Sequence, residues 1–292
     1  MTTAGRQFGW VLNLDAELEL VREGYVPRLK LLAQLAEHGA GSRALLGPED
    51  VLLEPGVRAP SGLVGRAWCP TPRALAVMRE AGVDPEPHPD VSVLRRVNHR
   101  LFAHEVGGGL AHQKYFTDQA ELEARLLHEP GPWLVKRPLA FAGRGQRRFY
   151  GTIDDKQRSW LDVSLARDGL IAEPLVQPLL EFSLHGFVWQ NGDFQLGEAC
   201  TQAVTDRGVF RGVRATDPAE LSTNELAALH ERGNAVAAAL HAAAYFGPFG
   251  IDAYRYRHHD TIAFCPLSEI NARYTMSFVT GFRGRPLREL VL

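Results

Sequence analysis

The first 95 or so residues alternate short apolar runs with amphipathic segments, a pattern typical of a small α/β unit. Apolar residues at 10–14 and 67–69 predict two short buried strands. Residues 27–38 and 73–81 place apolar side chains on one helical face, and each segment has a proline near its start and a glycine just past its end. We therefore expect strands and helices in alternation here.

A proline-rich stretch at 84–90 separates this unit from the rest of the chain. Its three prolines remove backbone donors and restrict the residues before them, so neither a helix nor a central strand can form there. We expect a domain edge nearby, at about residue 95.

Beyond that edge the spacing of apolar residues predicts further strands and helices. Asn191 and Gly192 separate two apolar runs, which is a signal for a β-hairpin. A long helix at 223–244 begins with a capping box, Ser222 with Glu225, and carries an apolar stripe. The other expected elements are helices at 97–102 and 118–127 and strands at 133–136, 148–150, 182–189, 250–252 and 262–270.

Composition is that of an ordinary globular protein. The 292 residues are 45% hydrophobic and 23% charged, enough for one large domain or two to three small ones. The formal net charge is −2, so the chain lacks the global basic field that attracts nucleic acid or anionic membranes. We expect neither as a partner, and any anion site must be local.

The chain start and the cysteines both favour the cytoplasm. The first seven residues lack the basic segment and apolar core of a signal peptide, and no apolar run reaches the ~18 residues needed to span a bilayer. Cys69, Cys200 and Cys265 are far apart and show no metal-binding spacing. We expect them to be reduced and partly buried.

The sequence Glu269-Ile270-Asn271-Ala272-Arg273 predicts a metal-bound nucleotide site. If residues 262–270 form a strand, alternation points Glu269 and Asn271 to the same face, where they offer two oxygen ligands. Mg²⁺ prefers such hard oxygen ligands together with phosphate oxygens. Arg273, on the same face, would add a fixed positive charge for phosphate.

Lys136 ends an apolar strand and precedes a glycine-containing loop at 142–145. A lysine there can stay charged if a phosphate compensates it, and glycines let backbone N–H groups approach phosphate oxygens. Taken alone, these residues are better explained as a structural hairpin, because a lysine at a strand end before a glycine hairpin is common. The loop has neither the Gly-Lys-Ser/Thr of a Walker A motif nor a Gly-x-Gly-x-x-Gly turn.

The order of these parts resembles the ATP-grasp superfamily over roughly residues 95–280. The closing Glu-x-Asn-x-Arg after a Gly-x-Asp strand is its most specific part. The resemblance implies a small α/β domain of the pre-ATP-grasp kind (1–95), then an α+β lid subdomain (96–176) and an α+β large subdomain with the metal site (177–292).

The resemblance also implies contacts with ATP. Lys136 would contact the α and β phosphates, with Arg100 where the family usually has a first lysine. The backbone of residues 177–180 would meet the adenine edge, and Glu181 would hold the ribose hydroxyls. The full set of implied nucleotide-binding residues is Arg100, Lys136, Gly143, Arg144, Gly145, Gln177, Leu179, Leu180 and Glu181.

By the same resemblance, Asp252, Glu269 and Asn271 would bind Mg²⁺, and Arg273 would stabilise the phosphoryl or acylphosphate group. Arg211 lies in a segment at 205–214 that carries three arginines. This segment could bind an acidic substrate or the γ-phosphate, or it could be a solvated charged loop.

Two other groups of polar residues have open interpretations. His185, on an expected strand, is better explained as a hydrogen-bonded strand histidine than as a catalytic base. Asn13, Asp15 and Glu17 follow the first strand, where they could line a substrate pocket or cap the next helix.

The expected function is an ATP-dependent ligase that activates a small-molecule carboxylate as an acylphosphate and joins it to an amine. Positioning and electrostatics can drive such a reaction without a protein nucleophile. The alternatives are a grasp-fold kinase, a peptide-modifying macrocyclase and a non-catalytic nucleotide-binding protein. A homodimer is compatible with the sequence.

Overall fold

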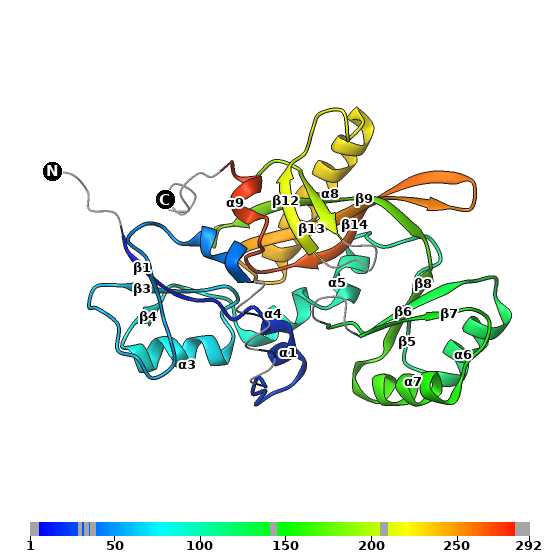
Figure 1. Cartoon of the computed structure of the whole chain (residues 1–292), viewed down its shortest axis with the longest axis horizontal. Coiled ribbons are helices and arrows are strands. Elements are labelled where there is room, and N and C mark those ends of the chain that lie inside the picture. Colours follow the sequence, from blue (N-terminus) through cyan, green and yellow to red (C-terminus); the bar gives the residue numbers. More distant parts are fainter. Residues whose placement is uncertain are drawn as a thin grey trace.

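The computed structural model describes residues 6–28, 31, 35, 39–140, 145–204 and 210–283. These residues form three sheets, each with its own helices (Figure 1). The expected architecture, an N-terminal α/β domain followed by two α+β subdomains, is confirmed.

The N-terminal unit contains a parallel sheet in the order β2-β1-β3-β4. Its edge strand β4 has only two residues, in agreement with the prolines of this stretch. Helix α3 packs on β1, β3 and β4, and Gly82 ends it in a left-handed conformation with a φ of 77°. The elements are β1 (Phe8–Val11), α1 (Ala16–Val21), η1 (Gly39–Leu45), β2 (Val51–Leu52), β3 (Val64–Ala67), α3 (Pro72–Ala81) and β4 (Asp84–Pro85).

The lid is an antiparallel sheet in the order β5-β8-β6-β7 with helices α6 and α7, seen at the lower right of Figure 1. It has a separate hydrophobic cluster that includes Phe116, Leu126 and Phe149. Its elements are β5 (Lys114–Phe116), α6 (Gln119–His128), β6 (Trp133–Lys136), β7 (Gln146–Phe149), α7 (Asp155–Asp168) and β8 (Leu170–Pro174).

The large subdomain contains the central sheet, in the order β12-β11-β9-β13-β14, with β10 paired to β9. Helix α8 lies on this sheet, and a Cβ at Gly233 would lie 2.8 Å from a Leu184 methyl carbon, so glycine permits the close approach. The elements are β9 (Gln177–Val188), β10 (Phe194–Leu196), β11 (Cys200–Val204), β12 (Phe210–Ala215), α8 (Thr223–Ala242), β13 (Gly247–His258), β14 (Thr261–Asn271) and α9 (Phe278–Gly281).

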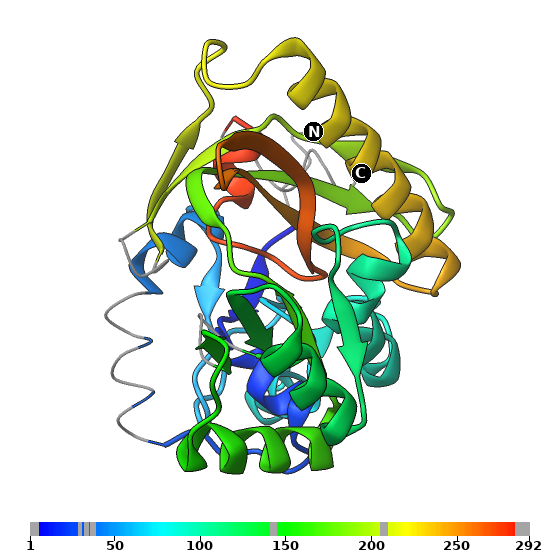
Figure 2. The ribbon, with the colours of Figure 1, turned by 90° about the vertical axis from the view of Figure 1, so that its right-hand side faces the viewer.

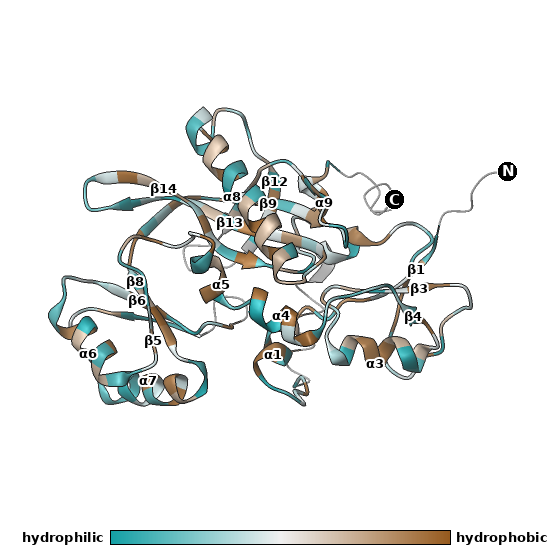
Figure 3. Ribbon diagram, turned by 180° about the vertical axis from the view of Figure 1, so that it is seen from behind, coloured by the Kyte–Doolittle hydropathy of each residue, from teal (hydrophilic) through white to brown (hydrophobic). Residues whose placement is uncertain are grey.

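The N-terminal unit and the large subdomain share one core. The ring centroids of Trp10 and Tyr274 lie 5.1 Å apart, and both side chains belong to a cluster that also contains Phe8 and Phe278. Helices α4 (Val91–Val97) and α5 (Arg100–Glu105) add Leu94 and other residues to this cluster. Figure 3 shows hydrophobic residues in α3, in β5 and along the central strands.

Most elements expected from the sequence are present, including the hairpin at Asn191 and the capping box of Ser222 with Glu225. The helix expected over 27–38 falls largely outside the described residues. The short helix expected to open at 97–102 is α5, which begins at Arg100, whereas the helix before it, α4, was not foreseen. Helix α7 was not foreseen.

The cysteines are free and buried, as expected. Burial raises the pKa of the Cys69 thiol strongly, that of Cys200 to about 12 and that of Cys265 to about 11. Within the described ranges, no helix combines the length and the apolar composition needed to cross a membrane.

Candidate active site

The candidate site lies where the lid meets the central sheet. Figure 2 shows the lid, in green, below the orange strands of that sheet. The chain passes from one sheet to the other at residues 175–176, between β8 and β9. Arg100, at the start of α5, bridges the two parts: its Nη1 donates to the carbonyl of Arg137 at 2.7 Å, and its Nη2 donates to Glu269 Oε2 at 3.1 Å.

Glu269 and Asn271 share one face of β14, as predicted. Ile270 between them is buried in the core, whereas both polar side chains are half-buried. Asp252 on β13 is paired in register with Glu269, and Asn271 Nδ2 donates to Asp252 Oδ2 at 2.9 Å. The structure thus brings together the three residues predicted to bind the metal.

Asp252 is held in an unfavourable electrostatic position. Gln202 Nε2 donates to its Oδ1 at 2.8 Å, but burial and the negative charge of Glu269 raise the pKa of Asp252 from 3.8 to about 6. Two carboxylates side by side in a partly buried site are stabilised when a cation binds between them. The environment of Asp252 therefore suits a cation.

These residues fit a magnesium ion by ligand chemistry. Asp252 and Glu269 supply carboxylate oxygens and Asn271 an amide oxygen, the hard donors that Mg²⁺ prefers. No group of three or more His, Cys, Asp or Glu side chains suited to a metal occurs in the described part of the chain. Two carboxylates and one amide oxygen would fill only part of the octahedral shell of Mg²⁺, so phosphate oxygens could complete it.

Arg273 is fixed by both the N-terminal unit and β14. Its Nε donates to Glu17 Oε1 at 2.6 Å, its Nη2 donates to Asn271 Oδ1 at 2.9 Å, and its Nη1 donates to the carbonyl of Tyr274 at 3.0 Å. Nη2 also forms an ion pair with Glu17. Most of its donors are therefore occupied, and the direct effect of Arg273 in this arrangement is to orient the amide of Asn271.

Lys136 forms an ion pair with Glu173, with 2.5 Å between Nζ and Oε1. Glu173, on the neighbouring strand β8, is buried, so the positive charge of Lys136 is already compensated inside the lid. Sequence reasoning missed Glu173. A signal was present, because a lone acid in the apolar run at 170–172 and 175–176 is rarely buried without a partner.

The residues expected around the nucleotide base lie just after the crossing between the sheets. Gln177, Leu179 and Leu180 belong to β9, and the first two are exposed. Glu181 follows them and is half-buried, and burial raises its pKa. Their roles toward a nucleotide stay predictions.

The glycine loop is only partly described. Gly145 has a φ of 85°, and its carbonyl accepts a hydrogen bond of 2.8 Å from the Arg137 N–H, which closes the β6–β7 hairpin. Gly143 and Arg144 lie outside the described residues.

Arg211 lies apart from this group. It is exposed on β12, the edge strand, and β11 and β9 lie between β12 and β13. Residues 205–209 of the same segment are outside the described residues. The structure does not bring Arg211 to the carboxylates.

His185 is a structural residue, as expected. It is buried, and its ring nitrogens lie 3.1 Å from Ser183 Oγ and 3.2 Å from Thr275 Oγ1. Burial lowers its pKa to about 3, so it stays neutral at physiological pH.

The polar residues after β1 form a buried network at the carboxyl edge of the first sheet. Asn13 Nδ2 donates to Thr71 Oγ1 at 3.0 Å, and Thr71 Oγ1 donates to Glu19 Oε2 at 2.5 Å. Asp15 makes no capping bond to α1 and instead pairs with Arg73. The helix-capping interpretation of Asp15 is therefore wrong, while a substrate-binding role stays a prediction.

A scan against protein-family models found no match, and a search of curated proteins found none either. Solved structures do match, at low sequence identity. N5-carboxyaminoimidazole synthetase from Staphylococcus aureus, complexed with ADP, is 12% identical with a TM-score of 0.55; the match covers 94% of this chain and 72% of that one.

Two further matches are similar in extent. The biotin carboxylase–β-γ-ATP complex from Campylobacter jejuni is 11% identical with a TM-score of 0.57, over 93% of this chain and 67% of that one. N5-carboxyaminoimidazole synthase from Aspergillus clavatus, in complex with ADP and 5-aminoimidazole ribonucleotide, is 16% identical with a TM-score of 0.51. This match covers 93% of this chain and 70% of that one. These are ATP-grasp enzymes, so the chain has the ATP-grasp fold with its preceding N-terminal domain.

Proposed function

We propose that this protein is an ATP-dependent ligase that forms an amide or peptide-like bond between a carboxylate and an amine. The observation that carries the proposal is the pairing of Asp252 with Glu269 beside Asn271, with Arg100 joining this group to the lid. The fold adds support, because solved proteins that share it carry ADP or ATP.

The residues fall into two groups around a bound nucleotide. Lys136 and Arg100 are the cations on the lid side and would face the phosphates, while Glu181 would accept hydrogen bonds from the ribose. Asp252, Glu269 and Asn271 would hold magnesium. When bound there, the ion supplies positive charge that offsets the charge of the triphosphate.

The proposed reaction needs no protein nucleophile. A carboxylate oxygen attacks the γ-phosphorus, the bond to the ADP oxygen breaks, and an acylphosphate forms. The amine then attacks the acyl carbon, inorganic phosphate leaves, and the amine proton passes to solvent or phosphate. The residues described here orient the partners and stabilise the transferred charge.

A two-substrate assay tests the proposal. Mg·ATP binding is measured by calorimetry, and release of ADP and phosphate is followed with pools of carboxylates and amines, singly and together. We expect both products only when a carboxylate and an amine are both present. Glu269→Gln should reduce turnover at least ~100-fold, since it removes a metal ligand and keeps the shape of the side chain.

The same assay can contradict the proposal. ADP with a stable phosphorylated product would indicate a kinase, and failure to bind Mg·ATP would indicate a non-catalytic role. Glu80→Ala, at an exposed position of α3 outside the site, is the control and should leave turnover unchanged.

A further inference from the structure

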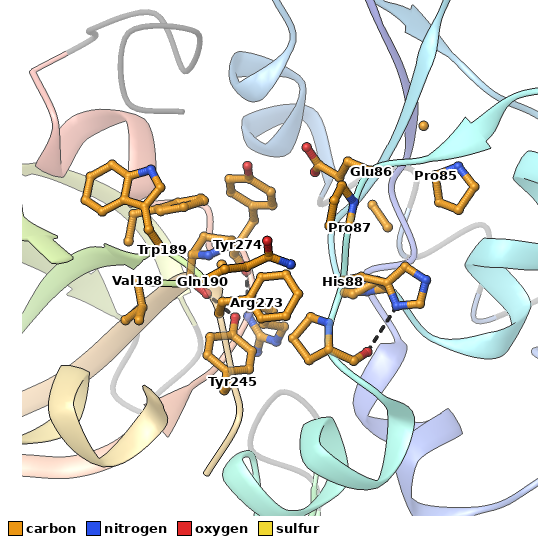
Figure 4. Close-up of a pocket in the computed structure, with 18 of the residues that line it drawn as sticks. Pro85, Glu86, Pro87, His88, Val188, Trp189, Gln190, Tyr245, Arg273 and Tyr274 are labelled. Atoms are coloured by element: carbon orange, nitrogen blue, oxygen red, sulfur yellow. Dashed lines mark hydrogen bonds between the residues drawn. The ribbon is translucent and has the colours of Figure 1, made fainter. Parts of the chain in front are cut away.

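A cavity of about 670 Å³ lies between the N-terminal unit and the central sheet. Neither Asp252 nor Glu269 lines it. We call it the seam pocket; in Figure 4 its labelled walls are Glu86, Pro87 and His88 on one side and Val188, Trp189 and Tyr245 on the other.

The walls of the seam pocket suit a flat apolar group. Pro85, Pro87 and Pro89 line one wall and offer no backbone N–H donors. Trp189 lines the other wall, and its ring packs against Phe187 with 5.2 Å between centroids. A volume of this size is within the range of small-molecule sites, and aromatic walls favour stacked rings.

Two of the charged side chains that line the pocket, Glu86 and Arg273, are already compensated. Glu86 accepts two hydrogen bonds from Arg66, at 2.8 and 2.7 Å, and Arg273 is paired with Glu17. A charged ring beside Glu86 would therefore lose hydration without gaining a free opposite charge, whereas Arg6 and Asp193, which also line the pocket, are exposed. The side-chain amide of Gln190 lines the pocket and makes no hydrogen bond to any described residue, so it is free to bind a polar atom of a ligand.

Arg273 connects the pocket to the candidate active site. It lines the pocket, and its Nη2 donates to Asn271 Oδ1 in the metal site. Its Nη1 uses one hydrogen for the carbonyl of Tyr274, which leaves a second N–H without a partner among the described residues. This N–H can bind a carboxylate without breaking the pair with Glu17.

We infer that the seam pocket holds the uncharged aromatic or heteroaromatic ring of the carboxylate substrate, and that the substrate carboxylate lies at Arg273. This inference rests on the proposed ligase function and assigns the chemical class of its substrate: carboxylic acids with a planar, uncharged ring.

Amino acids that share one backbone are the probes. L-tryptophan and L-phenylalanine are compared with L-alanine and L-glutamate by calorimetry in the presence of Mg·ADP, which excludes turnover. We expect the aromatic probes to bind at least ~10-fold more tightly than L-alanine, because they bury a ring. The same order is expected in kcat/KM for ADP release from ATP with ammonia as the amine.

Variants of the walls locate the binding site. Trp189→Ala should abolish the aromatic preference while the dissociation constant of Mg·ADP changes less than ~2-fold. Phe194→Ala removes an exposed aromatic ring from the same hairpin but outside the pocket, and should keep the preference. His88→Ala changes the opposite wall and replaces Trp189→Ala if that variant does not fold.

The outcomes separate the two proposals. Retention of the aromatic preference in Trp189→Ala and His88→Ala, or equal binding of all four probes, overturns the seam-pocket inference. If aromatic probes bind in the pocket but never release ADP, while another carboxylate and amine do, the pocket is an effector site and the inference is wrong. Absence of ADP with every pair overturns the ligase function itself, and with it the substrate role of the pocket.

Discussion

At the scale of single residues, the main feature of the site is Asp252, a carboxylate that the fold holds where its charged form is destabilised. Asp252 is half-buried beside Glu269 and receives hydrogen bonds from Gln202 and Asn271. Its pKa rises from 3.8 to about 6 because burial and the neighbouring charge favour the neutral form. The proposed binding of a cation beside Asp252 would offset this loss of stability, a trade-off that is common at functional sites.

Replacing Asp252 with asparagine should change how the free energy of unfolding depends on pH. The raised pKa stabilises the folded protein fully below about pH 3.8, and that contribution is lost as the pH rises through about 6. The free energy of unfolding of Asp252→Asn relative to wild type should therefore increase between pH 4 and pH 8, by up to about 3 kcal/mol for a shift of about two units.

Urea unfolding at several pH values measures this change, and turnover of the same variant should be lost. Asp193→Asn, on an exposed turn, is the control, and its free energy of unfolding relative to wild type should not change with pH. If the free energy of unfolding of Asp252→Asn relative to wild type does not change with pH, the pKa of Asp252 is ordinary and the pair of Asp252 and Glu269 carries no electrostatic strain.

At the scale of elements, helix α1 and the end of β14 are locked together by one buried ion pair. Glu17 on α1 and Arg273 after β14 are 256 positions apart, and their side chains are only 9% and 15% exposed. Because Arg273 also orients Asn271, the N-terminal unit takes part in shaping the candidate metal site.

A double-mutant cycle measures this link. Glu17→Gln should destabilise the protein by about 3 kcal/mol or more, since it leaves the guanidinium of Arg273 buried and uncompensated. Arg273→Met combined with Glu17→Gln should cost less than the sum of the single changes. The exposed pair of Arg283 and Glu198 is the control, with an expected coupling below about 1 kcal/mol.

Urea unfolding of the single and double variants gives both coupling energies. Equal coupling in the two pairs would show that the contact between Glu17 and Arg273 does not hold the two elements together.

The elements that could be predicted from the sequence are those specified by neighbouring residues, such as a turn pair, a helix cap or strand alternation. Asn191-Gly192 specifies its hairpin, Ser222 with Glu225 specifies the start of α8, and alternation along β14 places Glu269 and Asn271 on one face. Helix α7 was missed because only Leu161 and Ser164 are buried, so it has almost no apolar face.

The partners within the site depend on contacts between distant segments. Glu173 meets Lys136 through the pairing of β6 with β8, and Glu17 meets Arg273 through a domain contact. Neither pairing has a signal in the spacing of one sequence. The resemblance supplied the metal-binding trio, but not the hydrogen bonds that orient it.

At the scale of the whole molecule, the lid is an insertion with its own core, whereas the N-terminal unit is not independent. The hydrophobic cluster of the lid is separate, while Trp10 and Tyr274 belong to one shared cluster. The two ends of the lid lie side by side, because Lys114 and Ala172 are partners in neighbouring antiparallel strands.

Removing the lid should therefore leave a folded protein. A variant with residues 114–174 replaced by a short Gly-Ser linker should unfold cooperatively in urea but bind Mg·ATP at least ~100-fold more weakly, because Lys136 is gone. Removal of residues 1–95 should instead give no cooperative transition, since it cuts through the shared core. Near-ultraviolet circular dichroism and calorimetry distinguish these results.

A lidless protein that is molten, or one that binds Mg·ATP normally, would contradict this division of the molecule. A cooperative transition in the fragment without residues 1–95 would do so too.

The buried thiols have a practical consequence for following the lid. Maleimides react with thiolates, and burial keeps Cys69, Cys200 and Cys265 protonated at neutral pH. A cysteine introduced at the exposed position of Lys156 on α7 would then react far faster than the three native ones. A fluorophore attached there would report lid movement in an otherwise unaltered chain.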